Sequence, residues 1–367
     1  MDAVDKDIKV PAEFTLPIKQ VKFDRWVLCH HLFEQTGDRR GMDDEFALVV
    51  HIELHHSGES DSCHDRILPR YDCFCVENPY NRFEKETAMA QYKVIAGTFH
   101  VKGFQPDGDS IRFQANDPAN WDFFEWAQTA DKAAKKKQLR VESIDALETH
   151  YEGYHQPRPF ALAALEALLE MIGITTVTYS LSLTQIVDAN DGKAGFIASA
   201  STDRFGRPVS YLFPKSAKLT DGAVLDSASL PIEDSINFQL AREGLVYPTF
   251  YTTTDRVFAE KIRAVVSRAR KTRRGIWSID KTSDFTLYDI RTMEQDILLL
   301  PKLFRRLVGF FEGYADFAQL GAYLAKQRDN LVLWDGTKKK SLAELMKISG
   351  RRIQMKTPVE DILFNPK

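Results

Sequence analysis

The chain has 367 residues, of which 44% are hydrophobic and 28% are charged, and its formal net charge is −3. This length predicts two or three compact units, and the composition excludes bulk disorder. A sequence pI of about 6.3 excludes a uniformly basic nucleic-acid-binding surface. No apolar run approaches the ~18 residues of a membrane span. An acidic N-terminus, MDAVDKDIKV, and only four cysteines lead us to expect a cytoplasmic protein.

The first 90 residues have the pattern of a small β-rich domain. Two apolar runs, RWVLCHHLF and FALVVHIELHH, are separated by the polar segment QTGDRRGMDDE, and a third run, YDCFCVEN, follows. Short runs rich in β-formers and separated by polar turns predict a hairpin or small sheet. We therefore expect an N-terminal β-rich domain over residues 1–90, of unknown function.

Cysteine and histidine are concentrated in this region, between residues 29 and 75. Zinc accepts both ligands. The spacings miss the usual C-x2-C frame, although His51-x3-His55 is permissible. On alternating strands the cysteines would equally serve as small buried residues. The spacing favours a sheet without metal, and a structural zinc ion remains the alternative. The residues concerned are Cys29, Cys63, Cys73, Cys75, His30, His31, His51, His55, His56 and His64.

From Tyr92 the alternation of YKVIAGTFHVKGF and DSIRFQA around a Pro-Asp-Gly-Asp turn predicts paired strands. Further strands are predicted at LRVESID, TVTYSLS, AGFIASAST and PVSYLF. The segment RPFALAALEALLEMIG predicts a helix, with Pro159 near its start and Gly173 at its end. Two more helices are predicted in SINFQLAREG, closed by Gly244, and in DRVFAEKIRAVVSRARKTRR. After Ser278, two amphipathic stretches and short strand-like pieces around VLWDG and RIQMK indicate a mostly helical C-terminal extension, residues 281–367.

Three separated segments supply the acid and base groups that a metal-assisted phosphodiesterase requires: PDGDS at 106–110, RVESIDALE at 140–148 and DRFGR at 203–207. Asp109 and Asp145 offer the hard oxygen ligands that calcium prefers. Glu148 lies three residues beyond Asp145, within reach to act as a general base. Arg140 and Arg207 would bind the charge that gathers on a phosphodiester in its transition state.

These segments, followed by REG at 242–244 and RGIW at 274–277, resemble the staphylococcal nuclease (thermonuclease-like) family. The family shows β-D-G-D-[ST], then R-x3-[IVL]-D-[AT]-P-E, D-x-[YF]-G-R, [RK]-x-G and a final G-[IL]-W. All of these pieces occur here in that order across residues 91–280, with one change in the second. Each piece alone is weak, and the ordered set is specific.

The resemblance implies an α+β fold: a five-stranded OB-fold barrel with packed helices, flanked by the β-rich N-terminal domain and the helical extension. It implies one calcium ion bound by Asp109, Asp145 and the carbonyl of Ala146. It implies cleavage of DNA or RNA, with little sequence specificity, by the catalytic residues Arg140, Glu148 and Arg207. We expect further substrate contacts from Ser110, Arg204 and Phe205.

The chain departs from the family pattern in three places. Leu147 replaces the proline before the glutamate, which frees the backbone there and alters where Glu148 points. Phe205 stands where some relatives have tyrosine, so one phosphate hydrogen bond is lost. The insertion at residues 114–138 is longer than the family's short turn, and we expect it to extend or cap the substrate groove.

Other interpretations remain open. The barrel could be a non-catalytic scaffold that binds nucleic acid or protein, although the acids and arginines of the motifs are all present. The basic run KIRAVVSRARKTRR, residues 261–274, would neutralise phosphates or form a solvated helix face. The flanking regions could bind a protein partner or a second copy of the chain. Because a free nuclease endangers its cell, we also consider gating by the insertion or by the C-terminal helices.

Overall fold

The computed structural model describes residues 90–124 and 136–366, which belong to one compact unit. The predicted N-terminal β-rich domain and its cysteine and histidine cluster lie outside the described residues, as does the middle of the insertion, 125–135. Within the described part of the chain, no helix is long and apolar enough to cross a membrane.

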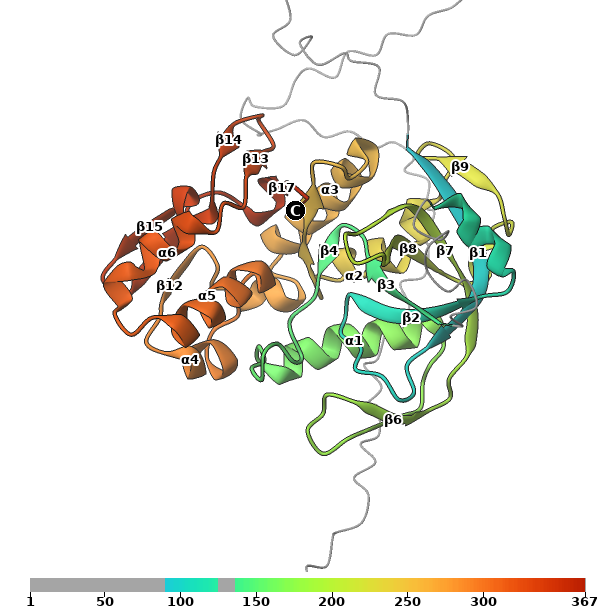
Figure 1. The fold of residues 1–367 in the computed structure, drawn as a ribbon, viewed down its shortest axis with the longest axis horizontal. Helices are drawn as coiled ribbons and strands as arrows, with labels where there is room; N and C mark the ends of the chain where they lie inside the picture. The colour runs from blue at the N-terminus through green and yellow to red at the C-terminus, as the bar shows by residue number, and fades with distance from the viewer. Residues whose placement is uncertain (1–89, 125–135, 367) are drawn as a thin grey trace, which may run out of the picture. The chain divides into compact units, whose positions relative to one another are not determined.

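A closed five-stranded mixed β-barrel is the centre of the structure (Figure 1). The strands run around the barrel in the order β1-β2-β3-β8-β7 and close where β7 pairs with β1. The β3–β8 pair is parallel and the other pairs are antiparallel. Their bounds are Gln91–His100 (β1), Ser110–Ala115 (β2), Lys137–Val141 (β3), Lys193–Thr202 (β7) and Pro208–Pro214 (β8), with Val224–Asp226 (β9) added beside β1.

Closure of so small a barrel needs close backbone approach along β1, which pairs with two neighbours. Gly97 of β1 stands opposite Gly195 of β7 and Ala115 of β2. A Cβ atom on Gly97 would lie 2.1 Å from the carbonyl oxygen of Gln114, and one on Gly195 would lie 2.6 Å from that of Phe213. Glycine at these two positions therefore lets the sheet curl onto itself.

Three helices of the central region begin and end where their sequence signals predict. The first, α1 (Arg158–Ile172), has Pro159 in its first turn and ends at Gly173 with φ 94°. The second and third, α2 (Ile236–Arg242) and α3 (Arg256–Lys271), are capped by the side chains of Ser235 and Asp255. The predicted strands are confirmed as well, because β1, β2, β3, β7 and β8 lie in the segments named for them. Shorter strands are β4 (Ile144–Asp145), β5 (Val177–Tyr179), β6 (Ile186–Ala189), β10 (Tyr247–Pro248) and β11 (Phe250–Tyr251).

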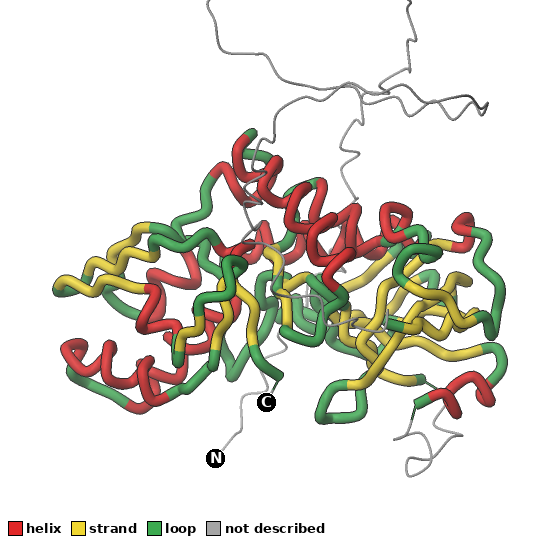
Figure 2. Tube along the Cα trace, turned by 90° about the horizontal axis from the view of Figure 1, so that it is seen from above, coloured by secondary structure: helices red, strands yellow, loops and turns green. Residues whose placement is uncertain are grey.

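The C-terminal segment, orange to red in Figure 1, is mixed in structure and not mostly helical. Its sheets have the orders β11-β17-β13-β14 and β12-β16-β15, and helix and strand segments alternate along it in Figure 2. The last strand pairs in parallel with β11, which ties the end of the chain to the central region. The bounds are β12 (Asp284–Thr286), α4 (Ile290–Gln295), α5 (Pro301–Gly313), α6 (Leu320–Lys326), β13 (Leu331–Leu333), β14 (Lys338–Lys339), β15 (Met346–Ser349), β16 (Arg352–Met355) and β17 (Ile362–Phe364).

The basic run on α3 is used largely for internal ion pairs. Arg263 binds Asp361 and Arg270 binds Glu360, so α3 holds the turn that precedes β17. Lys261 and Arg274 pair with Glu233 and Glu243. Cations that are paired with carboxylates have little charge left for a phosphate backbone, whereas the run's other cations, Arg268, Lys271 and Arg273, are exposed. The run is thus neither wholly a phosphate-binding surface nor wholly a solvated face.

Asn237 of α2 joins the helix to the barrel beside the functional segments. Its side-chain oxygen accepts from the backbone N–H of Leu212 at 2.9 Å. Its amide donates to the carbonyls of Glu142 and Ser210 at 2.9 and 3.1 Å. The side chain is fully buried, so no water is available to pair with these three backbone groups if the side chain is removed.

We predict that Asn237→Ala lowers the free energy of unfolding by about 2 to 4 kcal/mol, because it leaves buried backbone groups unpaired. Chemical denaturation followed by circular dichroism measures the change. Asn116→Ala, at an exposed asparagine, is the matched control and should change stability by less than ~0.5 kcal/mol. Equal stability of the two variants would contradict this role.

Candidate functional site

The loop between β1 and β2 brings two acids to one end of the barrel. Gly108 lies between Asp107 and Asp109, and a Cβ atom there would stand 2.7 Å from the Cβ of Ala146 and 2.9 Å from that of Ala164 on α1. Glycine thus lets the loop pack against the segment after β4. The backbone N–H of Ala146 donates to Oδ2 of Asp109 at 3.3 Å.

Asp145 is the last residue of β4, Glu148 follows three residues later, and the two are 4% and 8% exposed. Asp145 is opposite Tyr247 in the β4–β10 pair. Gln156 braces Glu148 twice: its side chain accepts from the Glu148 N–H at 3.2 Å, and its own N–H donates to the Glu148 carbonyl at 2.9 Å. Leu147, at the position where the resembling motif has proline, is fully buried. Packing of Leu147 and the Gln156 brace therefore hold this backbone without the proline.

Four carboxyl groups influence one another in this cluster, which we call the acidic cluster: Asp107, Asp109, Asp145 and Glu148. Burial, together with the charges of Asp107 and Asp145, raises the pKa of Asp109 well above its ordinary value. Burial also raises the pKa of Glu148 to about 7, against an opposing effect of Arg305. Oδ1 of Asp107 is buried and has no hydrogen-bond partner. The carboxyls are thus close enough for each to disfavour ionisation of its neighbours.

Arg305 of α5 reaches into the acidic cluster from a part of the chain 157 residues beyond Glu148. Its Nη2 donates to Oδ2 of Asp145 at 2.9 Å, and both Nη atoms lie 3.2 Å from Oδ1 of the same residue. Its Nη1 also pairs with Oε1 of Glu148. Although burial acts in the opposite direction, Asp145 and Glu148 raise the pKa of Arg305, which stays charged.

Arg140 on β3 has its own partner beside the cluster, the phenol of Tyr251. The Nη2–Oη distance is 2.6 Å, and the guanidinium lies 4.6 Å from the centre of the tyrosine ring. Lys302, one turn before Arg305 on α5, is 3.3 Å from the same phenol oxygen. Burial acts to raise the pKa of Tyr251, but Lys302 and Arg140 lower it below its ordinary value. This side of the cluster is therefore positively charged.

The segment 203–207 lies apart from these contacts. Arg207 precedes β8, whose Val209 is opposite Arg140, but its guanidinium binds Asp203 at 2.7 Å. Phe205 is 70% exposed, and Arg204 stacks on its ring at 4.7 Å. The structure thus brings Asp109, Asp145, Ala146, Glu148 and Arg140 together, whereas Arg207, Arg204 and Phe205 make no described contact with them.

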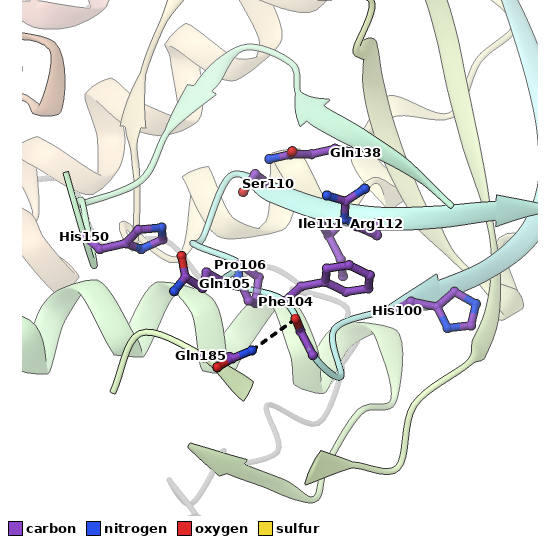
Figure 3. A pocket seen from close by; sticks show the side chains of 11 residues that line it. His100, Phe104, Gln105, Pro106, Ser110, Ile111, Arg112, Gln138, His150 and Gln185 are labelled. Carbon is purple, nitrogen blue, oxygen red and sulfur yellow. Dashed lines mark hydrogen bonds between the residues drawn. The ribbon is translucent and has the colours of Figure 1, made fainter. Parts of the chain in front are cut away.

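A polar groove of ≈ 360 Å³ lies at the start of β2, and Pro106 and Ser110, which flank the acids of the β1–β2 loop in the sequence, are among its lining residues (Figure 3). Ser110 is opposite Arg140 and Arg112 is opposite Gln138, so these side chains share one face of β2 and β3. The guanidinium of Arg112 stacks 4.4 Å above the ring of Phe104. The groove's other polar lining residues are His100, Gln105, His150 and Gln185.

The described part of the insertion does not cap this groove with a helix of its own. Its 3-10 helix, Pro118–Phe123, places Trp121 against Phe113 inside the barrel, with ring centres 6.5 Å apart. Trp121 and Phe124 are 3% and 4% exposed, so this stretch extends the core.

Divalent cations prefer hard oxygen ligands, which the acidic cluster offers. Yet in residues 90–124 and 136–366 no group of three or more acids, histidines or cysteines is arranged to hold a metal ion. The guanidinium of Arg305 between Asp145 and Glu148 gives the physical reason. The carboxylate oxygens are donors of the type that calcium prefers, but their arrangement around Arg305 does not fit the ion.

The sequence signals omitted several residues of the site. Asp107 stood in the motif but was interpreted only as part of a turn. Tyr251 and Lys302 lie in no recognisable motif. Arg305 is one of two adjacent arginines on an amphipathic helix. Arg306, the other arginine, binds the buried Asp329, and the sequence alone does not separate these roles.

No protein-family model matches the chain, and no curated protein matches its sequence. The family resemblance therefore depends on the motifs and on their positions in the barrel.

Glu142, two residues after Arg140, is a further carboxyl that the motifs did not single out. It accepts a hydrogen bond from the hydroxyl of Thr254 at 3.0 Å. Burial raises the pKa of Glu142 to about 7. An acid whose pKa is raised by folding stabilises the protein fully below its unfolded pKa, and this contribution is lost as pH rises through 7.

We predict that wild-type protein loses up to about 3 kcal/mol of stability relative to Glu142→Gln between pH 5 and pH 8, because only the carboxyl becomes charged while buried. Urea unfolding across this pH range measures the difference. Glu312→Gln, at an exposed carboxyl on α5, is the control and should leave the pH dependence of the wild type unchanged. A difference between wild type and Glu142→Gln that does not vary with pH would be inconsistent with a buried, titrating Glu142.

Proposed function

We propose that the protein is a phosphodiesterase of the thermonuclease-like type that hydrolyses DNA or RNA with little sequence specificity. The observation that carries this proposal is the convergence of Asp109, Asp145 and Glu148, with Arg140 beside them, at one end of a five-stranded barrel. These residues come from the separated segments that the family motifs name. A hydrolytic site for phosphodiesters needs acid and base groups together with cations, and this cluster supplies both.

We further propose that the barrel is an OB fold and that one calcium ion is the cofactor. Asp109, Asp145 and the carbonyl of Ala146 would hold the ion once Arg305 has withdrawn. When bound, such an ion polarises the phosphodiester and orients water. Glu148, whose pKa is raised to about 7, would accept a proton from that water near neutral pH, and Arg140 would bind a phosphate oxygen.

The groove beside Ser110 supports a path for the nucleotides that flank the scissile phosphate. Arg112 and Gln138 share the outer face of β2 and β3 with Ser110 and Arg140, so the path would run along one face without crossing the barrel. Phe104 offers an aromatic ring on which a base stacks, and Arg112 offers a cation for a phosphate. Arg204 and Phe205 are proposed to contact the substrate beyond this path.

We predict that purified protein cleaves single-stranded DNA, double-stranded DNA or RNA in millimolar calcium and not in EGTA. Arg140→Ala should lower kcat about 100-fold or more, because it removes a cation from the developing charge. Gel assays with labelled oligonucleotides measure both. Lys326→Ala, at an exposed lysine of α6, is the control and should cleave like wild type.

Calcium-dependent cleavage that survives Arg140→Ala unchanged would remove Arg140 from the mechanism. Absence of cleavage on every substrate, with Arg305→Gln included, would reject the nuclease. A contaminating nuclease is detected by Glu148→Gln, which should be inactive when the activity belongs to this chain.

We predict that Arg112→Gln weakens binding of single-stranded oligonucleotides and reduces the slope of log Kd against log salt by about 1, the value for one lost phosphate contact. Fluorescence anisotropy in EGTA, from 50 to 300 mM salt, measures it without cleavage. Lys326→Gln should leave both quantities unchanged. An unaltered salt slope for Arg112→Gln would place the substrate outside the groove.

The alternative function is a non-catalytic scaffold that binds nucleic acid or protein through the barrel surface. One observation favours it: Arg305 neutralises Asp145 and Glu148, the groups that catalysis requires. Oligonucleotide binding without cleavage, unchanged by Glu148→Gln and by Arg305→Gln, would select the scaffold.

A further inference from the structure

We propose that Arg305 is a built-in competitor of the divalent cation: its guanidinium occupies the acidic cluster, and a metal ion enters only when this side chain leaves Asp145 and Glu148. The inference rests on the proposed function for the identity of the cofactor. It concerns the regulation of the same site, through a residue outside the segment that resembles the nuclease family.

The geometry of Arg305 is that of a bridging cation. Its two Nη atoms contact both carboxylate oxygens of Asp145, and Nη1 also contacts Glu148. Its side chain is 28% exposed, whereas those of Asp145 and Glu148 are 6% and 10% exposed. The guanidinium therefore covers the two carboxylates on the side from which it enters.

Helix α5 is held firmly enough to keep Arg305 in place. On its buried face, Leu303, Phe304, Leu307 and Val308 are 0% exposed. The fully buried Gln156, which braces Glu148, also donates to the carbonyl of Leu299 at 2.7 Å, directly before α5. The backbone of Glu148 and the start of α5 are thus joined through one side chain.

The charges around the cluster make the competition direct. Arg305 and a divalent cation would both neutralise Asp145 and Glu148, and two cations cannot share these oxygens without strong repulsion. Lys302 and Arg140 approach from the same side and add positive charge. Asp107 and Asp109 complete the cluster, and Oδ1 of Asp107 is buried without a hydrogen-bond partner. Loss of the Arg305 guanidinium would leave Asp145 and Glu148 without their cation, and a divalent ion would then take its place.

The consequence is a lowered apparent affinity for metal. A ligand that binds only a minor conformation loses affinity by the fraction of molecules in that conformation. With Arg305 withdrawn in one molecule in a hundred, for example, the affinity for calcium falls about 100-fold. The protein would then bind calcium only when the calcium concentration is raised.

Deleting the C-terminal segment is a poor test, although it removes Arg305. The deletion also removes β17, which pairs with β11 next to Tyr251, and it strips α5 from its buried contacts. A single substitution leaves these contacts in place.

We predict that Arg305→Gln binds calcium, and terbium as its luminescent probe, at least ~10-fold more tightly than wild type does. Isothermal calorimetry with calcium and terbium luminescence measure the affinity without any substrate. The thermal midpoint of Arg305→Gln should also rise with added calcium at concentrations that leave wild type unchanged. Arg291→Gln, an exposed arginine on α4, removes the same charge outside the cluster and should bind metal like wild type.

Equal affinities of Arg305→Gln and wild type would overturn the proposal, as would an equal gain in Arg291→Gln. If Arg305→Gln does not fold without metal, Arg305→Lys takes its place. Lysine keeps the charge but lacks the planar fork with which arginine binds a carboxylate bidentately, so calcium affinity should rise about threefold or more, and an unchanged affinity would overturn the proposal.

Cleavage assays separate this inference from the proposed function. Tighter metal binding in Arg305→Gln with no cleavage by any variant would support competition between Arg305 and the metal ion, and it would reject the nuclease function. Calcium-dependent cleavage with equal metal affinity in both proteins would keep the nuclease and reject the competitor.

Discussion

The contact of Arg305 with Asp145 and Glu148 is the interaction on which the arrangement of the site depends. Carboxylates that are almost fully buried cost several kcal/mol each unless a cation or a proton neutralises them. Here the cation comes from α5, far along the chain, and a pKa of about 7 for Glu148 shows that burial still outweighs its attraction. The C-terminal segment is therefore part of the charge balance of the site and not an appendage to the barrel.

Local signals in the sequence predicted most of the central fold. Alternating residues gave β1 and β2, and Pro159 with Gly173 bounded α1, because these signals act within a few residues. The C-terminal strands, two to four residues long, depend on distant partners such as β11, so their sequence alone carried little information. The same holds for the site: the motifs predicted Asp109, Asp145 and Glu148, whereas Arg305 contacts these acids, and Tyr251 contacts Arg140, only through tertiary packing.

Local charge was a weaker guide than local hydrophobicity. The basic run on α3 suggested phosphate contacts, but Arg263 and Arg270 bind acids next to β17 and help to fix the end of the chain. By contrast, Arg112 stands in a segment with no excess of positive charge and lines the groove beside Ser110. Positive charge contributes to recognition where the fold leaves it near a concave surface, and that depends on strand register more than on composition.

The acidic cluster is costly for a protein that uses its barrel only as a scaffold. Replacing a buried ion pair by apolar groups of similar size is often neutral or stabilising. This chain instead has four interacting carboxyls, one of which has a buried oxygen without a hydrogen-bond partner. Arg305 forms ion pairs with two of the four. Local rules of stability are usually broken where function requires it. The cost of the cluster thus supports the proposed cation site, and the contacts of Arg305 with Asp145 and Glu148 let the fold tolerate the cluster.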